Sequence, residues 1–205
     1  MQKTKRHILL ILLASLIIPA HAQRKGFTQG YITNQEGETI RGWVKDRSSG
    51  TFIDLYTQIR FIPDHARGTR KYGPDEILGY GMNNQHFESM PLAEESSFFN
   101  FRYDLNEGNE RVFLKVISRT NDLTYYHWEY VDGESNYLDY TPLFHRTGSG
   151  EMVRVIQGIL GLKRNKLAAY FADCPELVQA LEKKELNEIY DVFNFYTERC
   201  SGEMK

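Results

Sequence analysis

The sequence predicts an α+β protein in which an antiparallel, β-rich body is followed by a helical C-terminal segment. From Phe27 to Phe144, short runs of aromatic and β-branched residues alternate with turn residues, which is the pattern of strands and hairpins. From Lys166 to Cys200, apolar residues recur at spacings of three and four with almost no turn residues, as in amphipathic helices. We expect about eight to ten strands, arranged as a sandwich or an open barrel.

The first 22 residues have the layout of a cleaved secretory signal. A basic start, Lys3 to Arg6, precedes an apolar run from Ile8 to Ile18, and small residues stand at positions 20 and 22. The apolar run is much shorter than the roughly 20 residues that span a bilayer. We therefore expect cleavage before Gln23, export to the periplasm or the extracellular space, and no transmembrane segment in the remaining chain.

Residues 23–205 are expected to comprise a β-rich region, 23–147, and a helical segment, 148–205, packed on it. Loss of Lys3, Lys5 and Arg6 from the 25 basic side chains would leave 22 against 27 acidic ones, a net charge of −5 with His neutral. A mildly acidic chain without a basic cluster does not suit nucleic acid, whose phosphates require Lys and Arg. Nucleic acid is therefore not an expected partner.

The β-rich region begins with a predicted hairpin, FTQGYIT and TIRGWVK, around Gly37, and continues with the strands TFIDLYT and QIRFI. Pro74 marks a tight turn, after which Gly79 and Gly81 stand two apart on an extended run. That spacing indicates a bulge or a close approach of another backbone. Residues 91–97 lack a pattern and are predicted to be a surface loop.

The clearest strands are RVFLKVIS, LTYYHWEYV and NYLDYTPLF, within residues 111–144. The turn segments RTND and DGES separate them, and Asp132-Gly133 is a strong hairpin signal. We expect a three-stranded antiparallel meander. It is rich in aromatic residues, which either pack in the core and across strands or form an exposed face that binds a partner protein or a glycan. The candidate face comprises Tyr125, Tyr126, Trp128, Tyr130, Tyr137 and Tyr140.

The two cysteines, Cys174 and Cys200, are predicted to form a disulfide. Cys174 precedes a helix with Pro175 at its first position, and Cys200 continues the apolar stripe of the last helix. If the two helices pack antiparallel, both thiols face inward and lie side by side, as an oxidising compartment favours. The spacing does not match a C-x-x-C redox motif, and a metal site or a catalytic thiol would require ligands or a His partner that the neighbouring sequence lacks.

His127 and Glu129 are the candidate chemical pair, because alternation places both on one face of a strand. They could act as a general base and its orienting carboxylate, or simply form polar surface contacts. No histidine pair has metal-binding spacing, and no phosphate-binding loop is present. We therefore assign no catalytic residue, no cofactor and no metal ligand.

Several segments in this order resemble a family of small exported proteins of unknown function from the Bacteroidetes. They are GYITNQEGETIRGWV, YGPDEILGYG, FLKVI, DCP and the C-terminal helix that carries Cys200. AEESSFFNFRYD and the segment around RTGSG match nothing in that pattern. The resemblance implies a periplasmic or cell-surface location and the same pair of cysteines, and it transfers no activity. The expected function is that of a non-enzymatic envelope protein that binds a partner through the aromatic face. The alternatives are a small periplasmic enzyme centred on His127 and Glu129, and a carbohydrate-binding module.

Overall fold

The computed structural model describes residues 25–49, 53–97, 100–106, 108, 110–156 and 161–201. The predicted signal peptide, residues 1–22, lies outside them. The described residues form one antiparallel sheet and, after it, three helices, which confirms the predicted fold class. The strands are β1 Thr28–Thr33, β2 Thr39–Arg47, β3 Leu55–Pro63, β4 Arg70–Tyr72, β5 Gly79–Met82, β6 Gln85–Pro91, β7 Ala93–Ser97, β8 Asn100–Asp104, β9 Arg111–Arg119, β10 Leu123–Val131, β11 Leu138–Arg146 and β12 Glu151–Arg154. The helices are α2 Arg164–Tyr170, α3 Pro175–Glu182 and α4 Ile189–Arg199.

The twelve described strands form an open sheet in the order β4-β3-β2-β1-β5-β6-β9-β10-β11-β12-β8-β7. This number exceeds the expected eight to ten. Residues 91–97, predicted to be a loop, contain β7, and β12 lies beyond residue 147, where the β-rich region was expected to end. The β5–β6 hairpin was also missed, because its turn is Asn83-Asn84 rather than a glycine turn. Both asparagines have positive φ, as a two-residue type I′ turn requires.

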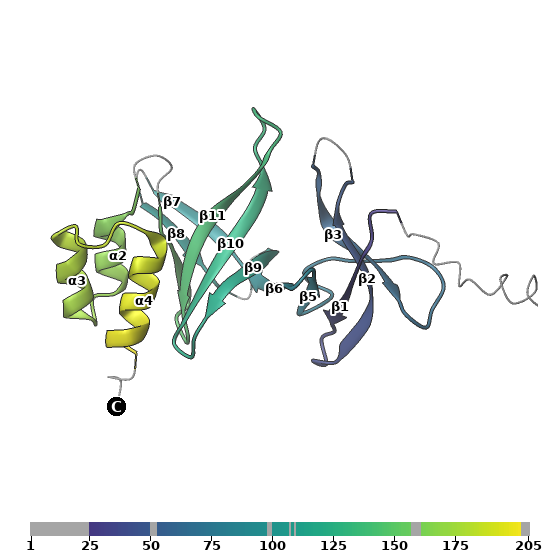
Figure 1. Ribbon diagram of the computed structural model, residues 1–205, viewed down its shortest axis with the longest axis horizontal. Coiled ribbons are helices and arrows are strands. Elements are labelled where there is room, and N and C mark those ends of the chain that lie inside the picture. Colours follow the sequence, from purple (N-terminus) through teal and green to yellow (C-terminus); the bar gives the residue numbers. More distant parts are fainter. Residues whose placement is uncertain are drawn as a thin grey trace, which may run out of the picture.

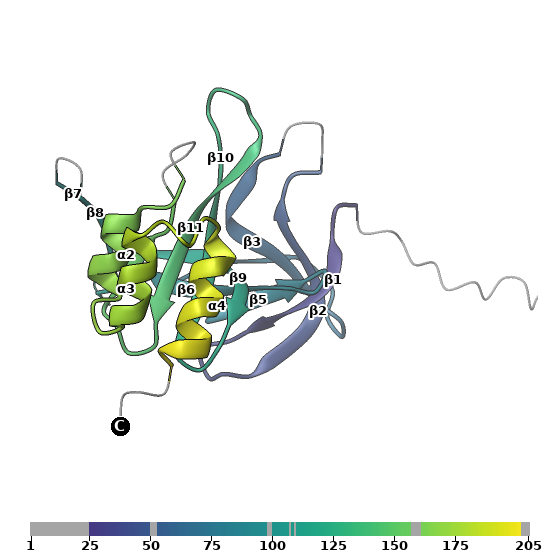
Figure 2. The ribbon, with the colours of Figure 1, turned by 60° about the vertical axis from the view of Figure 1, so that its left-hand side comes forward.

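The three helices pack at one end of the molecule, and β1–β4 lie at the other (Figure 1). Figure 2 shows the helices in front of the sheet. Side chains of β10 and β11 alternate between two buried environments. Tyr125 and Phe144 pack against the helices, whereas Tyr126 and Leu143 enter a separate core cluster on the other side of the same strands. A third cluster fills the N-terminal half of the sheet, around Val44 and Phe61. The first half of β10 and the paired end of β11 are therefore buried on both faces, which accounts for Tyr125, Tyr126 and Phe144.

The predicted disulfide is present between Cys174 and Cys200, whose Cα atoms lie 5.7 Å apart. Cys174 caps α3, with Pro175 at the first turn, and Cys200 caps the end of α4. The bond therefore joins the start of one helix to the end of the next. Leu181 of α3 and Phe193 and Tyr196 of α4 are buried in the core cluster that the helices share with the sheet.

Gly79 and Gly81 of β5 lie in close contact with neighbouring residues. Of the two alternatives predicted for this segment, a bulge or a close approach, the structure shows the close approach. A Cβ at Gly81 would overlap the ring of Tyr31, and one at Gly79 would overlap the carbonyl oxygen of Phe87. The strand pairs in regular register with both neighbours, so close approach, and not a bulge, is the reason for glycine here. No helix among the described residues is long and apolar enough to cross a membrane.

Candidate binding site

Strands β9 and β10 separate part of the way along their length. Their ladder runs from Arg119↔Thr124 to Lys115↔His127. Beyond that pair β9 continues alongside β6 as far as Arg111↔Pro91, and β10 continues alongside β11 as far as Val131↔Leu138. The two strands thus diverge, and we call the opening between Arg111–Leu114 and Trp128–Val131 the fork. The β10–β11 hairpin rises on one side of it and β3 on the other (Figure 1).

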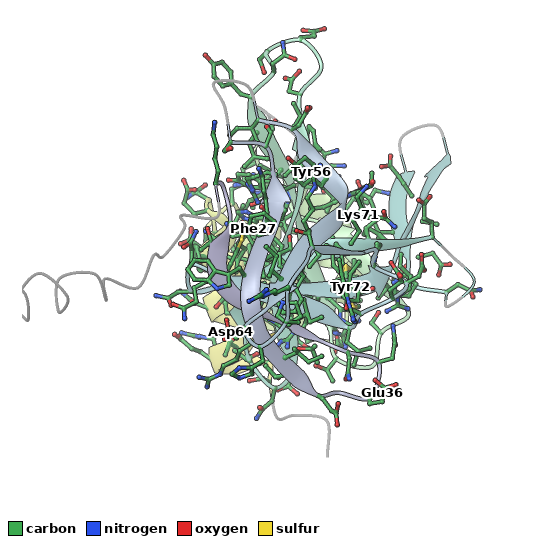
Figure 3. All side chains as sticks on the ribbon, turned by 90° about the vertical axis from the view of Figure 1, so that its right-hand side faces the viewer. Phe27, Glu36, Tyr56, Asp64, Lys71 and Tyr72 are labelled. Atoms are coloured by element: carbon green, nitrogen blue, oxygen red, sulfur yellow. A yellow bond between two sulfur atoms is a disulfide. The ribbon has the colours of Figure 1, made fainter. Side chains whose placement is uncertain are left out.

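A second irregularity faces the fork from the N-terminal half of the sheet. In the pairing of β2 with β3, Lys45 lies opposite Arg60 and Arg47 opposite Leu55. Residues 56–59 of β3 therefore lie opposite the single residue Asp46 of β2. On the other side of β3, strand β4 pairs with Ile59–Phe61. The segment bulges away from its neighbours. Figure 3 labels Tyr56 on this segment, with Lys71 and Tyr72 of β4 nearby.

A cavity of about 420 Å³ lies at the fork, within the range of roughly 300–1,000 Å³ that is usual for ligand sites. Its wall combines aromatic rings, charged side chains and backbone. The residues that line it are Asp46, Arg47, Leu55, Tyr56, Thr57, Gln58, Gly73, Pro74, Asp75, Tyr80, Phe87, Glu110, Arg111, Val112, Phe113, Trp128 and Glu129.

The lining includes consecutive residues of single strands, Leu55–Gln58 of β3 and Arg111–Phe113 of β9. Successive side chains of a strand point to opposite faces, so a cavity on one face of a sheet meets only every second residue. A cavity that meets consecutive residues borders the edge of the strand. The fork cavity therefore borders β9 at Arg111–Phe113, beyond the last pair of its ladder to β10.

The floor of the cavity is a chain of hydrogen-bonded side chains from four strands, four of them charged and one a tyrosine. Arg47 donates two hydrogen bonds to Asp46, at 2.8 and 2.7 Å, and one to Glu129 at 2.9 Å. The Lys115 ammonium donates to the other oxygen of Glu129 at 3.3 Å, and the Tyr80 hydroxyl donates to Asp46 at 3.2 Å. The sequence Tyr80–Asp46–Arg47–Glu129–Lys115 connects β5, β2, β10 and β9. We call it the floor network.

Burial and hydrogen bonding shift the pKa values of two members of the floor network, Arg47 and Tyr80. Asp46 is 3% exposed, and a buried charge is tolerated only when it is paired. The hydrogen bonds from Arg47 to Asp46 raise the pKa of the guanidinium against the opposing effect of burial. Burial, and then the charge of Asp46, raise the pKa of the Tyr80 hydroxyl well above its usual range. Arg47 is therefore always charged and Tyr80 always a donor near neutral pH.

The rim differs from the floor. Asp75 and Glu110 are exposed acidic residues, whereas Arg111 donates to the hydroxyl and the carbonyl oxygen of Ser89 at 2.9 and 2.8 Å. The lining carries four carboxylates and two guanidinium groups. Because Arg47 and Lys115 are paired with Asp46 and Glu129, the charge that a ligand meets is mainly that of the rim, namely the carboxylates of Asp75 and Glu110 and the guanidinium of Arg111.

His127 and Glu129, the predicted chemical pair, have different hydrogen-bond partners in the described structure. Glu129 lines the fork cavity, but His127 turns toward the helical side, where its Nε2 lies 2.7 Å from the Tyr125 hydroxyl and its ring stacks on Tyr140 at 3.7 Å. Burial and the nearby Lys115 lower the pKa of His127 to about 4, although Glu129 partly opposes this. His127 is neutral near pH 7, and the arrangement gives it no contact with the cavity.

The six predicted face residues have different environments. Tyr125 and Tyr126 are core residues on opposite sides of β10, at 3% and 2% exposure, so they do not contribute to a binding face. Trp128 lines the fork cavity and packs edge-on against Tyr103. The exposed members are Tyr130, Tyr137 and Tyr140, at the end of the β10–β11 hairpin.

Sequence reasoning missed most of the cavity: Asp46, Arg47, Tyr56, Arg111 and Phe113 were not selected. One signal was available for the first two. Asp46-Arg47 ends a strand whose alternation, WVKDR, places the acidic Asp46 on the same side as the apolar Val44. An aspartate at a core-facing position requires a buried partner, but the sequence does not show which strands supply Tyr80 and Glu129.

A second polar network lies on β6 and β9. Glu88 accepts hydrogen bonds from His86 at 3.3 Å, from Arg119, and from the Tyr126 hydroxyl at 2.6 Å. Burial opposes ionisation of Glu88, but these three donors outweigh it and hold the pKa of Glu88 far below its usual range. The network ties β6, β9 and β10 together below the fork, where the three strands still form one continuous sheet.

Comparisons with protein-family models, with curated proteins and with solved structures find no match to this chain. Among the described residues, no group of three or more His, Cys, Asp or Glu side chains is placed to hold a metal ion.

Proposed function

We propose that this chain is a non-enzymatic, exported binding protein, and that the fork cavity is its binding site. The observation that carries the proposal is the combination of a sizeable cavity with exposed strand edges at the point where β9 and β10 diverge. Exposed strand edges are normally covered or blunted. A fold that leaves two of them open beside aromatic rings offers a preformed surface to a ligand.

The charged side chains of the cavity support binding over catalysis. A binding site is most effective when its polar groups are already fixed in place before the ligand arrives. In the floor network, both oxygens of Asp46 and both of Glu129 already accept hydrogen bonds from Arg47, Lys115 or Tyr80. His127, the base of the enzyme alternative, lies on the helical side of β10. A floor held in place by these hydrogen bonds orients a ligand without first rearranging.

An envelope location is part of the proposal. The predicted signal at residues 1–22 and the resemblance to exported Bacteroidetes proteins both favour it. The Cys174–Cys200 disulfide is consistent with them, because structural disulfides form mainly in oxidising compartments. The partner we propose is therefore a component of the cell envelope.

Site-specific crosslinking in cells tests this function. A photoreactive benzoylphenylalanine replaces Tyr56 at the fork, and the matched control replaces Tyr190, a partly exposed tyrosine of α4 on the helical side. We expect light-dependent adducts of defined mass from position 56 and not from position 190. Equal background from both positions would reject the fork as a binding site. The same probe at Tyr137, which is 75% exposed, shows whether the partner also reaches the β10–β11 hairpin.

A further inference from the structure

We propose that the fork binds an extended peptide segment of a partner protein, which pairs with the free edge of β10 and places a basic side chain in the cavity. This inference rests on the proposed binding function and specifies its ligand class. It combines three features of the fork: unpaired backbone, the space next to that backbone, and the charge of the rim.

The first feature is the unpaired backbone of Trp128–Val131. In an antiparallel strand, N–H and C=O groups point to the two sides in turn. Strand β11 pairs with β10 along its whole length, to Val131↔Leu138, but the ladder to β9 ends at His127. The groups of Trp128–Val131 that point toward the fork therefore have no strand to pair with in the described part of the sheet. A peptide in extended conformation supplies matching donors and acceptors.

The second feature is the position of the cavity. It lies between the diverging strands, with Arg111, Val112 and Phe113 on one side and Trp128 and Glu129 on the other. A strand added to β10 would occupy the place that β9 leaves, and alternate side chains would point into the cavity or out of it. A volume of about 420 Å³ accommodates one long side chain together with the neighbouring backbone.

The third feature selects the side chain. The exposed carboxylates of Asp75 and Glu110 stand at the rim, and the floor cations Arg47 and Lys115 are already paired with Asp46 and Glu129. Phe113 and Trp128 contribute partly exposed aromatic rings, whereas the ring of Tyr56 already carries the Arg60 guanidinium at 4.5 Å. Carboxylates beside aromatic faces attract a cation. Lysine or arginine is therefore the expected residue, because two carboxylates at the rim, Asp75 and Glu110, outnumber its one guanidinium, that of Arg111.

Selection from a random 12-residue peptide library, displayed on phage, against the purified disulfide-bonded protein tests the inference. We expect enrichment of peptides that contain Lys or Arg within an alternating, β-branched pattern. A synthetic copy of the enriched peptide is then measured by fluorescence anisotropy, with each backbone nitrogen methylated in turn. Methylation should weaken binding by about tenfold or more at alternate positions, where the N–H donates to β10, and much less at the positions between.

Three controls on the protein side separate strand addition from other modes. Thr57→Trp fills the mouth of the cavity from an exposed position and should abolish binding, whereas Thr39→Trp, at an exposed position in the β1–β2 hairpin, should not. The double variant Asp75→Asn/Glu110→Gln should weaken binding by about threefold to tenfold. Hydrogen exchange should show new protection in the segment 128–131 when the enriched peptide is bound.

The outcomes distinguish the inference from the function on which it rests. Enriched peptides that tolerate methylation everywhere, or that leave the exchange of residues 128–131 unchanged, would reject strand addition. A second outcome is that no enriched peptide is blocked by Thr57→Trp, while position 56 crosslinks to a glycan or a lipid. That result would support the binding function and reject a peptide as the ligand. No adduct at position 56 and no enriched peptide would reject both.

Discussion

The guanidinium of Arg47 and the carboxylate of Glu129, 82 positions apart in the sequence, are joined by a hydrogen bond of 2.9 Å across the floor of the fork. Arg47 belongs to β2 in the N-terminal half of the sheet, and Glu129 belongs to β10 in the C-terminal half. Strands β1, β5, β6 and β9 lie between them in the sheet order. The contact therefore spans the fork and holds the two halves in a fixed relation.

The Arg47–Glu129 contact should have a measurable coupling energy. In a double-mutant cycle with Arg47→Met and Glu129→Gln, we expect a coupling of about 1–2 kcal/mol by urea denaturation, because both side chains are largely buried. Arg47→Met alone should cost roughly 3–5 kcal/mol, since it leaves Asp46 buried without its cation. The exposed pair Arg199–Glu176, at 3.8 Å, is the control, and its coupling should be below about 0.5 kcal/mol. Equal coupling in both pairs would contradict this account.

The disulfide should stabilise the protein without shaping the fork. Cys174 and Cys200 close a loop with a sequence separation of 26, for which the chain-entropy relation gives roughly 3–4 kcal/mol. Cys174→Ala/Cys200→Ala should lower the free energy of unfolding by about that amount and leave the affinity for the enriched peptide within about twofold. Reduction of the wild-type protein should add the mass of two hydrogen atoms. A loss of binding in a variant that remains folded would show that the helices influence the fork.

Stability should depend on pH through His127. Its pKa is about 4 in the folded protein, below the ordinary value of 6.5, so the unfolded chain binds the proton first as the pH falls. Stability therefore decreases from about pH 6.5 to about pH 4, and below that both states are protonated. A shift of this size corresponds to roughly 3 kcal/mol, and screening of the partly exposed ring reduces it to about 1–2 kcal/mol. His127→Gln should remove this part of the loss on acidification, while His65→Gln, at an exposed position, should leave it in place.

The close approach at Gly81 should make that position intolerant of a side chain. A Cβ there overlaps the ring of Tyr31, which is held by a hydrogen bond between its hydroxyl and Nδ1 of His86 at 3.0 Å. Gly81→Ala should destabilise the protein by about 1–3 kcal/mol in thermal or urea unfolding. Gly133, in the β10–β11 loop, has open space around it, and Gly133→Ala should change stability by less than about 0.5 kcal/mol. A tolerant Gly81 would mean that β1 and β5 are not packed as closely as described.

Local patterns in the sequence predicted those parts of the fold that depend on neighbouring residues. The meander between Arg111 and Phe144, the helical C-terminal segment and the pairing of Cys174 with Cys200 all followed from periodicity and turn signals. Short strands without such signals were missed. One example is β7, whose sequence AEESS lacks the aromatic and β-branched residues that mark a strand, and which forms because β8 pairs with it.

The candidate site was predicted only where one strand contains it. The sequence singled out Trp128 through the aromatic content of β10, but it grouped Trp128 with Tyr125 and Tyr126, which are buried on opposite sides of that strand. It also joined Glu129 to His127, because alternation places them on one face. In the structure, Glu129 forms ion pairs with Arg47 and Lys115. His127 forms a hydrogen bond with Tyr125 and stacks on Tyr140.

By itself, the sequence determined the fold class and the cysteine pairing, since strand and helix periodicity and the antiparallel return of two adjacent helices are local properties of the chain. It also carries the predicted signal for export. Only the tertiary structure decided where β9 leaves β10 and which side chains meet at that point. The floor network consists of residues from four strands: Tyr80, Asp46, Arg47, Glu129 and Lys115. Their contacts depend on strand order and register, and long-range pairing of this kind leaves no periodic trace in the sequence of any one strand.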